Sequence, residues 1–177
     1  MNFSIPLVLL CSLIIPITQA NIQIGSTANE VTLNDKLGGT VSGEAWSATK
    51  ALSNNKVNLV FYIDPDNRTL NDDLADRLKA EKFPRTNYAS TVVMNMAATW
   101  LPNDFLNDIL KKKQVQFPDT TYVKDLDKVL VKEWNLPDDS YTVMAFDKSG
   151  KLFFRRDGKF APENIEELVS GIRARLN

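Results

Sequence analysis

The sequence predicts an α/β fold in which helices flank a central mixed β-sheet, preceded by an N-terminal β extension. Residues 57–63 form a nearly unbroken apolar run, which is typical of a central strand covered on both faces. Residues 70–78 place their leucines on one helical face, and residues 162–176 show the same pattern more clearly. Strands that alternate with helices in this way indicate an α/β sheet.

The first half of the chain supplies an entry segment, a turn and two strands. Residues 21–56 are rich in Thr, Asn and Gly and alternate weakly, so we expect a β-hairpin or an extended arm. Residues 64–67 contain a proline and capping side chains, which predict a turn with Asp66 or Asn67 as the helix N-cap. Residues 91–96 predict a second buried strand.

The second half continues the alternation. A helix should follow Pro102 and turn four apolar side chains toward the core, namely Phe105, Leu106, Ile109 and Leu110. A short strand at 120–123 leads to a further helix. Residues 141–146 and 152–154 then predict an antiparallel hairpin, and Pro162 opens the closing helix.

The first twenty residues have the pattern of a cleavable signal peptide. They carry no charged side chain, and their apolar stretch, 5–17, is too short to cross a bilayer. Thr18 and Ala20 occupy the third-last and last places before the expected cleavage site, so the mature chain should begin at Asn21. The expected organisation is a signal peptide (1–20), an N-terminal β arm (21–56) and a folded domain (57–177).

The composition excludes several chemistries. The chain has no histidine and one cysteine, Cys11, inside the predicted signal peptide. A chain that begins at Asn21 would have no thiolate nucleophile, no disulfide and no imidazole base or metal ligand. The net charge is −1 and the longest positive run is 111–113, so we expect no nucleic-acid partner. We also expect no cofactor, no metal and no stable membrane anchor after cleavage.

Strand, helix and strand followed by an antiparallel hairpin and a closing helix is similar to the thioredoxin-like topology. More narrowly, the chain resembles the YtfJ family of bacterial periplasmic thioredoxin-like proteins. Four stretches carry this resemblance: Ala-Thr-Trp-Leu-Pro at 98–102, Thr-Tyr-Val-Lys-Asp at 121–125, Val-Leu-Val-Lys-Glu-Trp at 129–134 and Asp-Asp-Ser at 138–140. The resemblance implies a thioredoxin-like fold and a periplasmic location, and it implies no established activity.

The chain differs from redox-active thioredoxins at the positions of their redox cysteines and of their cis-proline. Asp66 and Thr69 align near the two redox cysteines, and Ser140-Tyr141 stands where thioredoxins carry a cis-proline. In that topology the first helix aims its N-terminal N–H groups at a peptide-binding groove. We therefore expect Asp66, Arg68 and Thr69 to face Ser140 and Tyr141, with Arg68 and Tyr141 as anchors for a partner or ligand.

Two further candidates lie after the second strand. Asn95 ends that strand, and Trp100 follows in a loop. The simpler interpretation is that Asn95 hydrogen-bonds a local turn and that Trp100 covers the edge of the core. A binding role for either residue stays open.

The sequence leaves two hypotheses about function. The first is an exported thioredoxin-fold protein without thiol redox activity that binds a periplasmic protein or a small ligand. The second is a magnesium-dependent phosphatase with Asp64 as phosphoryl acceptor and Asp66 as acid/base, because Asp-x-Asp after a hydrophobic strand is typical of haloacid-dehalogenase-type enzymes. Arg68 puts Thr69 one place too far for that motif, so we favour a binding protein over an enzyme.

Overall fold

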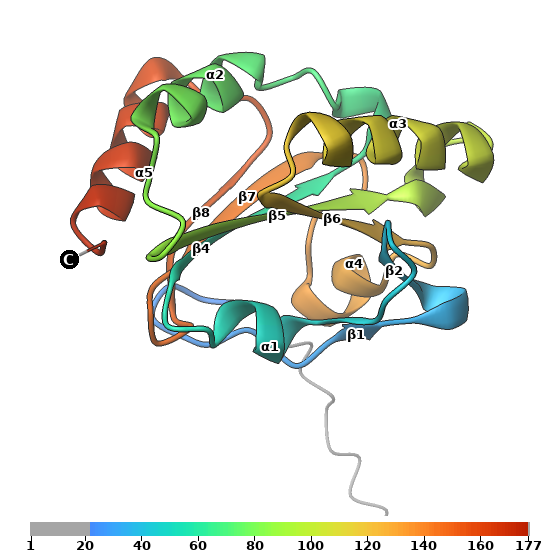
Figure 1. Cartoon of the computed structure of the whole chain (residues 1–177), viewed down its shortest axis with the longest axis horizontal. Helices are drawn as coiled ribbons and strands as arrows, with labels where there is room; N and C mark the ends of the chain where they lie inside the picture. Colours follow the sequence, from blue (N-terminus) through green and yellow to red (C-terminus); the bar gives the residue numbers. More distant parts are fainter. Residues whose placement is uncertain (1–21, 177) are drawn as a thin grey trace, which may run out of the picture.

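The computed structural model describes residues 22–176, which are built around a six-stranded mixed sheet (Figure 1). The strand order is β2-β6-β5-β4-β7-β8. The parallel strands are β4 (Val57–Ile63), β5 (Tyr88–Asn95) and β6 (Thr120–Asp125), and the strands antiparallel to their neighbours are β2 (Gly38–Thr40), β7 (Tyr141–Phe146) and β8 (Leu152–Asp157). The predicted α/β fold with a central mixed sheet is confirmed.

β4 lies near the middle of the sheet, as its apolar run predicts. All of its residues are buried, and it pairs with β5 on one side and β7 on the other. Side chains alternate between the two faces of a strand, so Leu59 and Phe61 pack on one face and Val60 and Tyr62 on the other.

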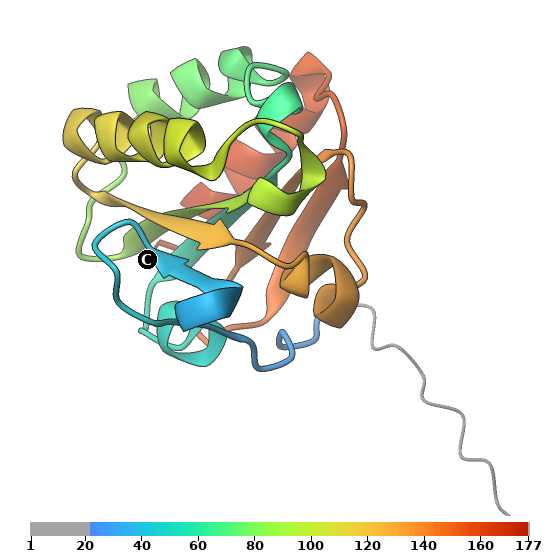
Figure 2. The same cartoon turned by 90° about the vertical axis from the view of Figure 1, so that its right-hand side faces the viewer.

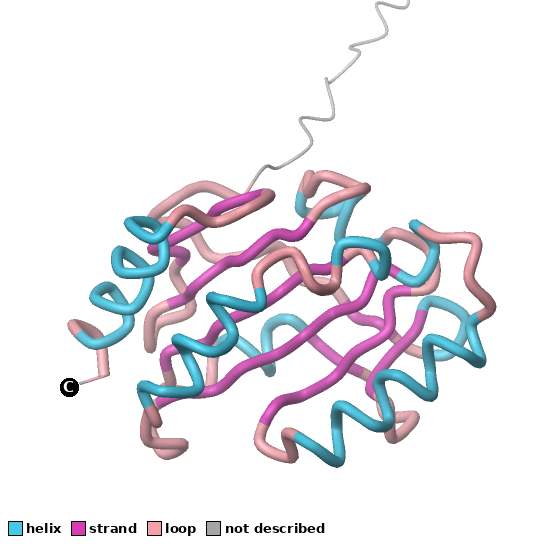
Figure 3. Tube along the Cα trace, turned by 90° about the horizontal axis from the view of Figure 1, so that it is seen from above, coloured by secondary structure: helices cyan, strands magenta, loops and turns pink. Residues whose placement is uncertain are grey.

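One face of the sheet is covered by three helices, α2 (Asp72–Glu81), α3 (Asn103–Gln116) and α5 (Pro162–Arg173). Figure 3 shows these helices lying over the strands. Leu74 of α2 and Leu168 of α5 belong to the same buried cluster as Leu59, and Leu106 of α3 belongs to a second cluster with Met94 of β5. In each of these helices, the apolar face that the sequence pattern defines is the face that is buried against the sheet.

The opposite face is covered by the N-terminal segment and by α4 (Val129–Trp134). The N-terminal segment holds the antiparallel pair β1 (Thr32–Leu33) and β3 (Trp46–Ser47), the helix α1 (Ala48–Leu52), and β2, which joins the main sheet beside β6. Leu33 is fully buried, and the Trp46 ring meets the Trp134 ring edge-on at 6.3 Å between centroids. The segment 22–56 thus contributes buried side chains to the core, namely Ile22, Val31, Leu33, Trp46, Ala48 and Leu52.

Two local predictions are wrong. The capping residue after β4 is Asp64, whose side chain accepts a hydrogen bond from the Asp66 N–H at 2.8 Å and opens the short 3-10 helix Pro65–Asn67. The helix α2 starts only at Asp72. Phe105 does not face the core, because α3 is rotated so that Leu106 is buried and Phe105 remains 51% exposed.

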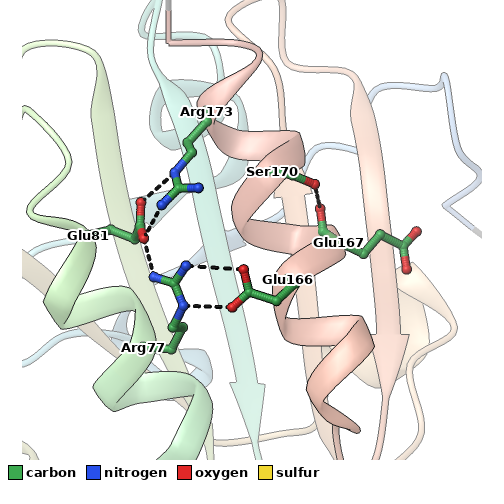
Figure 4. A network of polar contacts seen from close by, with 6 residues as sticks. All are labelled: Arg77, Glu81, Glu166, Glu167, Ser170 and Arg173. Carbon is green, nitrogen blue, oxygen red and sulfur yellow. Dashed lines mark hydrogen bonds and ion pairs between the residues drawn. The ribbon is translucent and has the colours of Figure 1, made fainter.

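An ion-pair network joins α2 to α5 on the outside of the fold (Figure 4). Glu81 accepts hydrogen bonds from Arg77 and from Arg173, the latter at 2.6 and 2.7 Å, and Arg77 also pairs with Glu166 at 2.7 Å. The hydrogen bonds from Arg173 and Arg77 hold the pKa of Glu81 below its usual value. The network therefore stabilises the contact between the two helices while Glu81 is ionised.

Candidate binding face

The carboxyl ends of β4, β5 and β6 meet at one edge of the sheet, because the three strands are parallel neighbours. Figure 2 views the molecule from this side, with the segments that follow β4, β5 and β6 toward the viewer. In open α/β sheets, ligands bind outside the carboxyl ends of the strands. We therefore call the residues of 64–69, 95–101 and 137–140 the carboxyl-edge face.

Two strand ends hold the loop before β7. The Asp64 N–H donates to the Ser140 carbonyl oxygen at 2.9 Å, and Ile63 lies opposite Tyr141 in the ladder between β4 and β7. The Asn95 Nδ2 donates to Asp138 Oδ1 at 2.9 Å and to the Asp138 carbonyl oxygen at 3.3 Å. The end of β4 thus lies beside Ser140, and the facing of Asp66, Arg68 and Thr69 toward Ser140 stays a prediction.

Tyr141 is not available as an exposed anchor. Its side chain is only 5% exposed, and its ring packs edge-on against Phe61 with centroids 6.2 Å apart. Burial raises the pKa of the Tyr141 hydroxyl well above its usual value. The expected role of Tyr141 as a surface contact is therefore wrong, and the residue belongs to the core.

The other candidates after β4 are at the surface. Asp66, Arg68 and Thr69 are exposed, and Arg68 Nη1 donates to the Pro65 carbonyl oxygen at 2.8 Å. That contact ties the Arg68 guanidinium to its own turn. These residues remain candidate contacts on the carboxyl-edge face.

Asn95 has a long-range role that sequence reasoning missed. The residue is fully buried, and its partner Asp138 is 43 residues away, so the interpretation as a local turn is wrong. Its Oδ1 has no hydrogen-bond partner within residues 22–176. A buried carbonyl oxygen without a donor is costly, which makes Asn95 the least satisfied polar group of this face.

Lys128 completes the contact around Asp138. The distance from Lys128 Nζ to Asp138 Oδ2 is 2.5 Å. Partial burial raises the pKa of Asp138, but the hydrogen bonds from Lys128 and Asn95 outweigh this effect and leave the pKa below its usual value. The same hydrogen bond, with the nearby carboxylates, raises the pKa of Lys128. The Asn95 amide and the Lys128 ammonium group therefore both bind Asp138 and hold the loop before β7 in place.

Asp125 is a second buried carboxylate that the sequence did not reveal. Its Oδ2 accepts from the Tyr62 hydroxyl at 3.1 Å and from the Leu130 N–H at 3.0 Å, and its Oδ1 accepts from the Val129 N–H at 2.9 Å. These bonds satisfy N–H groups in the first turn of α4. Asp125, the last residue of the motif Thr-Tyr-Val-Lys-Asp, thus caps the first turn of α4.

Trp100 is the most exposed large apolar side chain on this face. It is 87% exposed, so it does not cover the edge of the core. It follows the 3-10 helix Met96–Ala98 and precedes α3, in whose first turn Phe105 is also half exposed. Exposed tryptophan and phenylalanine side chains are enriched at protein-binding surfaces.

The geometry around Asp64 is that of a cap. Asp64 Oδ1 accepts from the Asp66 N–H, and Asp64 Oδ2 accepts from Asn67 Nδ2 at 3.2 Å. Burial raises the pKa of Asp64. Within residues 22–176, no group of three or more acidic side chains is placed to hold a metal ion. Both carboxylate oxygens are thus occupied by the turn that follows β4.

A bacterial family of unknown function, described as YtfJ_HI0045, matches residues 18–175. The chain belongs to this family. An uncharacterised protein of Escherichia coli, YtfJ, is 25% identical over 101 residues, which are 56% of this chain and 54% of that protein. An uncharacterised protein of Haemophilus influenzae is 28% identical over 102 residues, 56% of this chain and 55% of the relative. The chain thus spans about half the length of the curated relatives that it matches.

Solved structures show which fold this family member has. A putative thiol:disulfide interchange protein DsbE from Chlorobium tepidum superposes with a TM-score of 0.62 at 16% identity, covering 89% of this chain and 100% of its own. The exposed lipoprotein thioredoxin Etrx1 from Streptococcus pneumoniae gives 0.58 at 14% identity, covering 81% and 99%. The thioredoxin-like fold is therefore confirmed. Among the helices of residues 22–176, none has the length and hydrophobicity of a membrane-spanning segment.

Proposed function

We propose that this YtfJ-family protein is exported to the periplasm and binds another protein through the carboxyl-edge face, without thiol chemistry. The observation that carries the proposal is the 87% exposure of Trp100, which lies in the segment after β5, whose last residue, Asn95, is fully buried and bonded to Asp138. The contact between Asn95 and Asp138 fixes the start of the segment that carries Trp100. Less conformational entropy is then lost when a partner binds the exposed ring. Tryptophan is also enriched among the residues that dominate binding energy.

The absence of redox cysteines supports a binding role over an exchange reaction. Asp66 and Thr69 stand in the first turns after β4, and no residue from 22 to 176 is a cysteine. Such a chain keeps the thioredoxin-like fold, while its residues 22–176 lack the two thiols that exchange needs. A small ligand in place of a protein would use the same face.

Quantitative affinity capture from periplasm tests this function. The Trp100→Ala variant should retain at least tenfold less of the captured protein, since a central aromatic contact contributes about 2 kcal/mol or more. Val115→Ala is the matched control, because Val115 is 83% exposed but lies near the far end of α3. Reducing agent should change neither result. Equal capture by the wild type and Trp100→Ala would refute the proposed face.

The phosphatase hypothesis gains no support from the site, because both oxygens of Asp64 are used by the turn. Turnover of p-nitrophenyl phosphate with Mg²⁺, lost in Asp64→Asn, would nevertheless establish it. We expect no turnover.

A further inference from the structure

The carboxyl-edge face carries more acidic than basic side chains. Its charged residues are four aspartates and one arginine, namely Asp64, Asp66, Asp138, Asp139 and Arg68. Burial raises the pKa of Asp64, and the negative charges of Asp66 and Asp139 raise it further. The carboxylates that follow β4 therefore lie within electrostatic range of Asp139 in the loop before β7.

The two exposed aspartates of this face have no cation of their own. Lys128 Nζ lies 2.5 Å from Asp138 Oδ2, and the Arg68 guanidinium donates to the backbone of its own turn. In the part of the chain that the structure describes, neither the Asp66 nor the Asp139 carboxylate forms an ion pair or accepts a hydrogen bond, and both residues are exposed. Their charges are therefore available to a partner.

A buried acceptor lies beside the same loop. Asn95 is fully buried, and its side chain points at Asp138, to which Nδ2 donates at 2.9 Å. Its Oδ1 has no donor within residues 22–176. An occupant that brings N–H donors to this face would stabilise the acceptor, directly or through one bridging water. The acceptor and the unpaired carboxylates thus favour the same kind of ligand, one that is rich in N–H groups.

Trp100 adds an open aromatic ring to this acidic face. The rings of Tyr88, Phe117 and Phe153 each meet an arginine or a lysine of the chain itself. Trp100 is 87% exposed and has no such contact among residues 22–176. A cation over an aromatic ring is attracted by the ring quadrupole, most strongly over tryptophan. The ring is therefore available to a cation of another molecule.

We propose that the carboxyl-edge face binds an arginine of the partner protein, flanked by apolar residues, whose guanidinium meets Trp100 and the carboxylates of Asp66 and Asp139. This inference rests on the function proposed above and names the chemistry of its partner. Ile63 and Met94 lie opposite each other in the parallel ladder, so the segments that carry Asp66 and Trp100 leave the sheet side by side (Figure 2).

Arginine fits this face better than lysine. Its planar guanidinium stacks on an aromatic ring and presents five N–H donors to carboxylates, whereas an ammonium group is a compact point charge with three donors. The apolar flanks also have a counterpart, because Phe105 in the first turn of α3 is 51% exposed. Burial of this ring against an apolar side chain of the partner would stabilise the complex.

Binding of short end-capped peptides tests this chemistry. The probe has one arginine between two leucines, and the matched probe has citrulline, which is uncharged and has nearly the same shape, in place of the arginine. Titration of the ¹⁵N-labelled protein with the arginine probe should shift amide resonances of residues 96–101 and 138–140. The citrulline probe should bind about fivefold more weakly at low salt. About 0.5 M salt should remove most of this difference, because exposed charges are screened.

Two variants separate the charges from the ring. Replacing both aspartates, by Asp66→Asn and Asp139→Asn together, should weaken the arginine probe about fivefold and leave the citrulline probe unchanged. Trp100→Ala should weaken both probes. Asp119→Asn is the matched control, because Asp119 is an exposed carboxylate that precedes β6 at the opposite end of the sheet, and it should bind both probes as the wild type does. The spectrum of each variant shows whether it is folded.

The proposal is overturned if the arginine probe causes no shifts at millimolar concentration, if both probes bind equally at low salt, or if the double aspartate variant binds the arginine probe as the wild type does. A dimer in sedimentation that Trp100→Ala abolishes would assign the face to a second copy and also overturn it. Capture from periplasm distinguishes the two proposals. Capture that depends on Trp100 but not on Asp66 and Asp139 keeps the proposed function and rejects the arginine, whereas capture that depends on none of them rejects both.

Discussion

Replacing Asn95 by aspartate perturbs the contact that fixes the loop before β7. Asparagine and aspartate have nearly the same shape, so the substitution keeps the packing while it replaces the N–H donor by an oxygen of an ionisable carboxyl group. In the wild type, Asn95 Nδ2 donates to both Asp138 Oδ1 and the Asp138 carbonyl oxygen, while Asn95 Oδ1 has no partner within residues 22–176. In Asn95→Asp, a fully buried carboxylate would face the carboxylate of Asp138.

Two effects add in this variant. The lost hydrogen bond to a charged group costs about 1.5–3 kcal/mol. Repulsion between two carboxylates at contact distance costs up to about 4 kcal/mol at an effective dielectric constant of 20, although proton uptake limits the cost. We expect Asn95→Asp to lower the free energy of unfolding by about 3 kcal/mol or more at pH 7.

Asn95→Ala provides the comparison. It also removes the donor, but it removes the unpartnered Oδ1 as well, whose burial costs about 1–3 kcal/mol. The two effects oppose each other, so we expect a net loss of only about 1 kcal/mol, apart from a small cavity. Asn95→Asp should thus be clearly less stable than Asn95→Ala, although it keeps the shape of the native side chain.

The pH dependence separates charge repulsion from altered packing. The new carboxyl has a raised pKa in the folded state, so the folded state binds a proton more readily than the unfolded state. The stability deficit of Asn95→Asp should therefore grow as pH rises through the raised pKa and shrink as pH falls toward 4. Urea unfolding, followed by tryptophan fluorescence from pH 4 to 8, measures the deficit.

Asn103→Asp is the control, because Asn103 is exposed in the first turn of α3, where a negative charge is favourable. It should be as stable as the wild type or slightly more stable. The reasoning is refuted if Asn95→Asp and Asn95→Ala have equal stability at pH 7, or if the deficit of Asn95→Asp does not change with pH.

Three other outcomes are expected. Glu81→Gln should lower stability by about 1 kcal/mol near pH 7; because the folded pKa of Glu81 is lowered, the difference should vanish as pH falls through that pKa, as urea unfolding in acid would show. Gly38→Ala should cost about 2 kcal/mol or more, since its φ is +131° and a Cβ would lie 1.9 Å from the Lys124 carbonyl oxygen; thermal unfolding measures this. Intact mass of exported protein should show a chain that begins at Asn21 and takes up no thiol reagent.

The sequence was sufficient for the strands and helices whose pattern is set by burial. The apolar run of β4 predicts its central position, and the stripe of α5 predicts its buried face, because each pattern reflects one local period. Leu106 and Leu110 were placed correctly, but Phe105 was misplaced because the predicted apolar face of α3 was drawn wide enough to include it, and packing against β5 buries Leu106 and not Phe105. Local pattern does not determine that rotation.

The polar contacts of the carboxyl-edge face could not be predicted from the sequence. Asn95 meets Asp138 across 43 residues, and Tyr62 meets Asp125 across 63, so neither pair has a local signal. The thioredoxin-like topology led us to expect residues 66–69 to face Ser140, and in the structure it is the Asp64 N–H at the end of β4 that bonds to Ser140. The burial of Tyr141 was missed, since alternation in β7 is hidden where both of its faces are covered.

Hydrogen–deuterium exchange on the complex captured from periplasm tests the central claim most directly. If the carboxyl-edge face is the binding surface, bound protein should show slower exchange than free protein at residues 96–102, around Trp100, and in the loop 138–140. Exchange in α5 and at the opposite end of the sheet should be unchanged. Protection confined to other segments, with residues 96–102 exchanging as fast as in the free protein, would contradict the account.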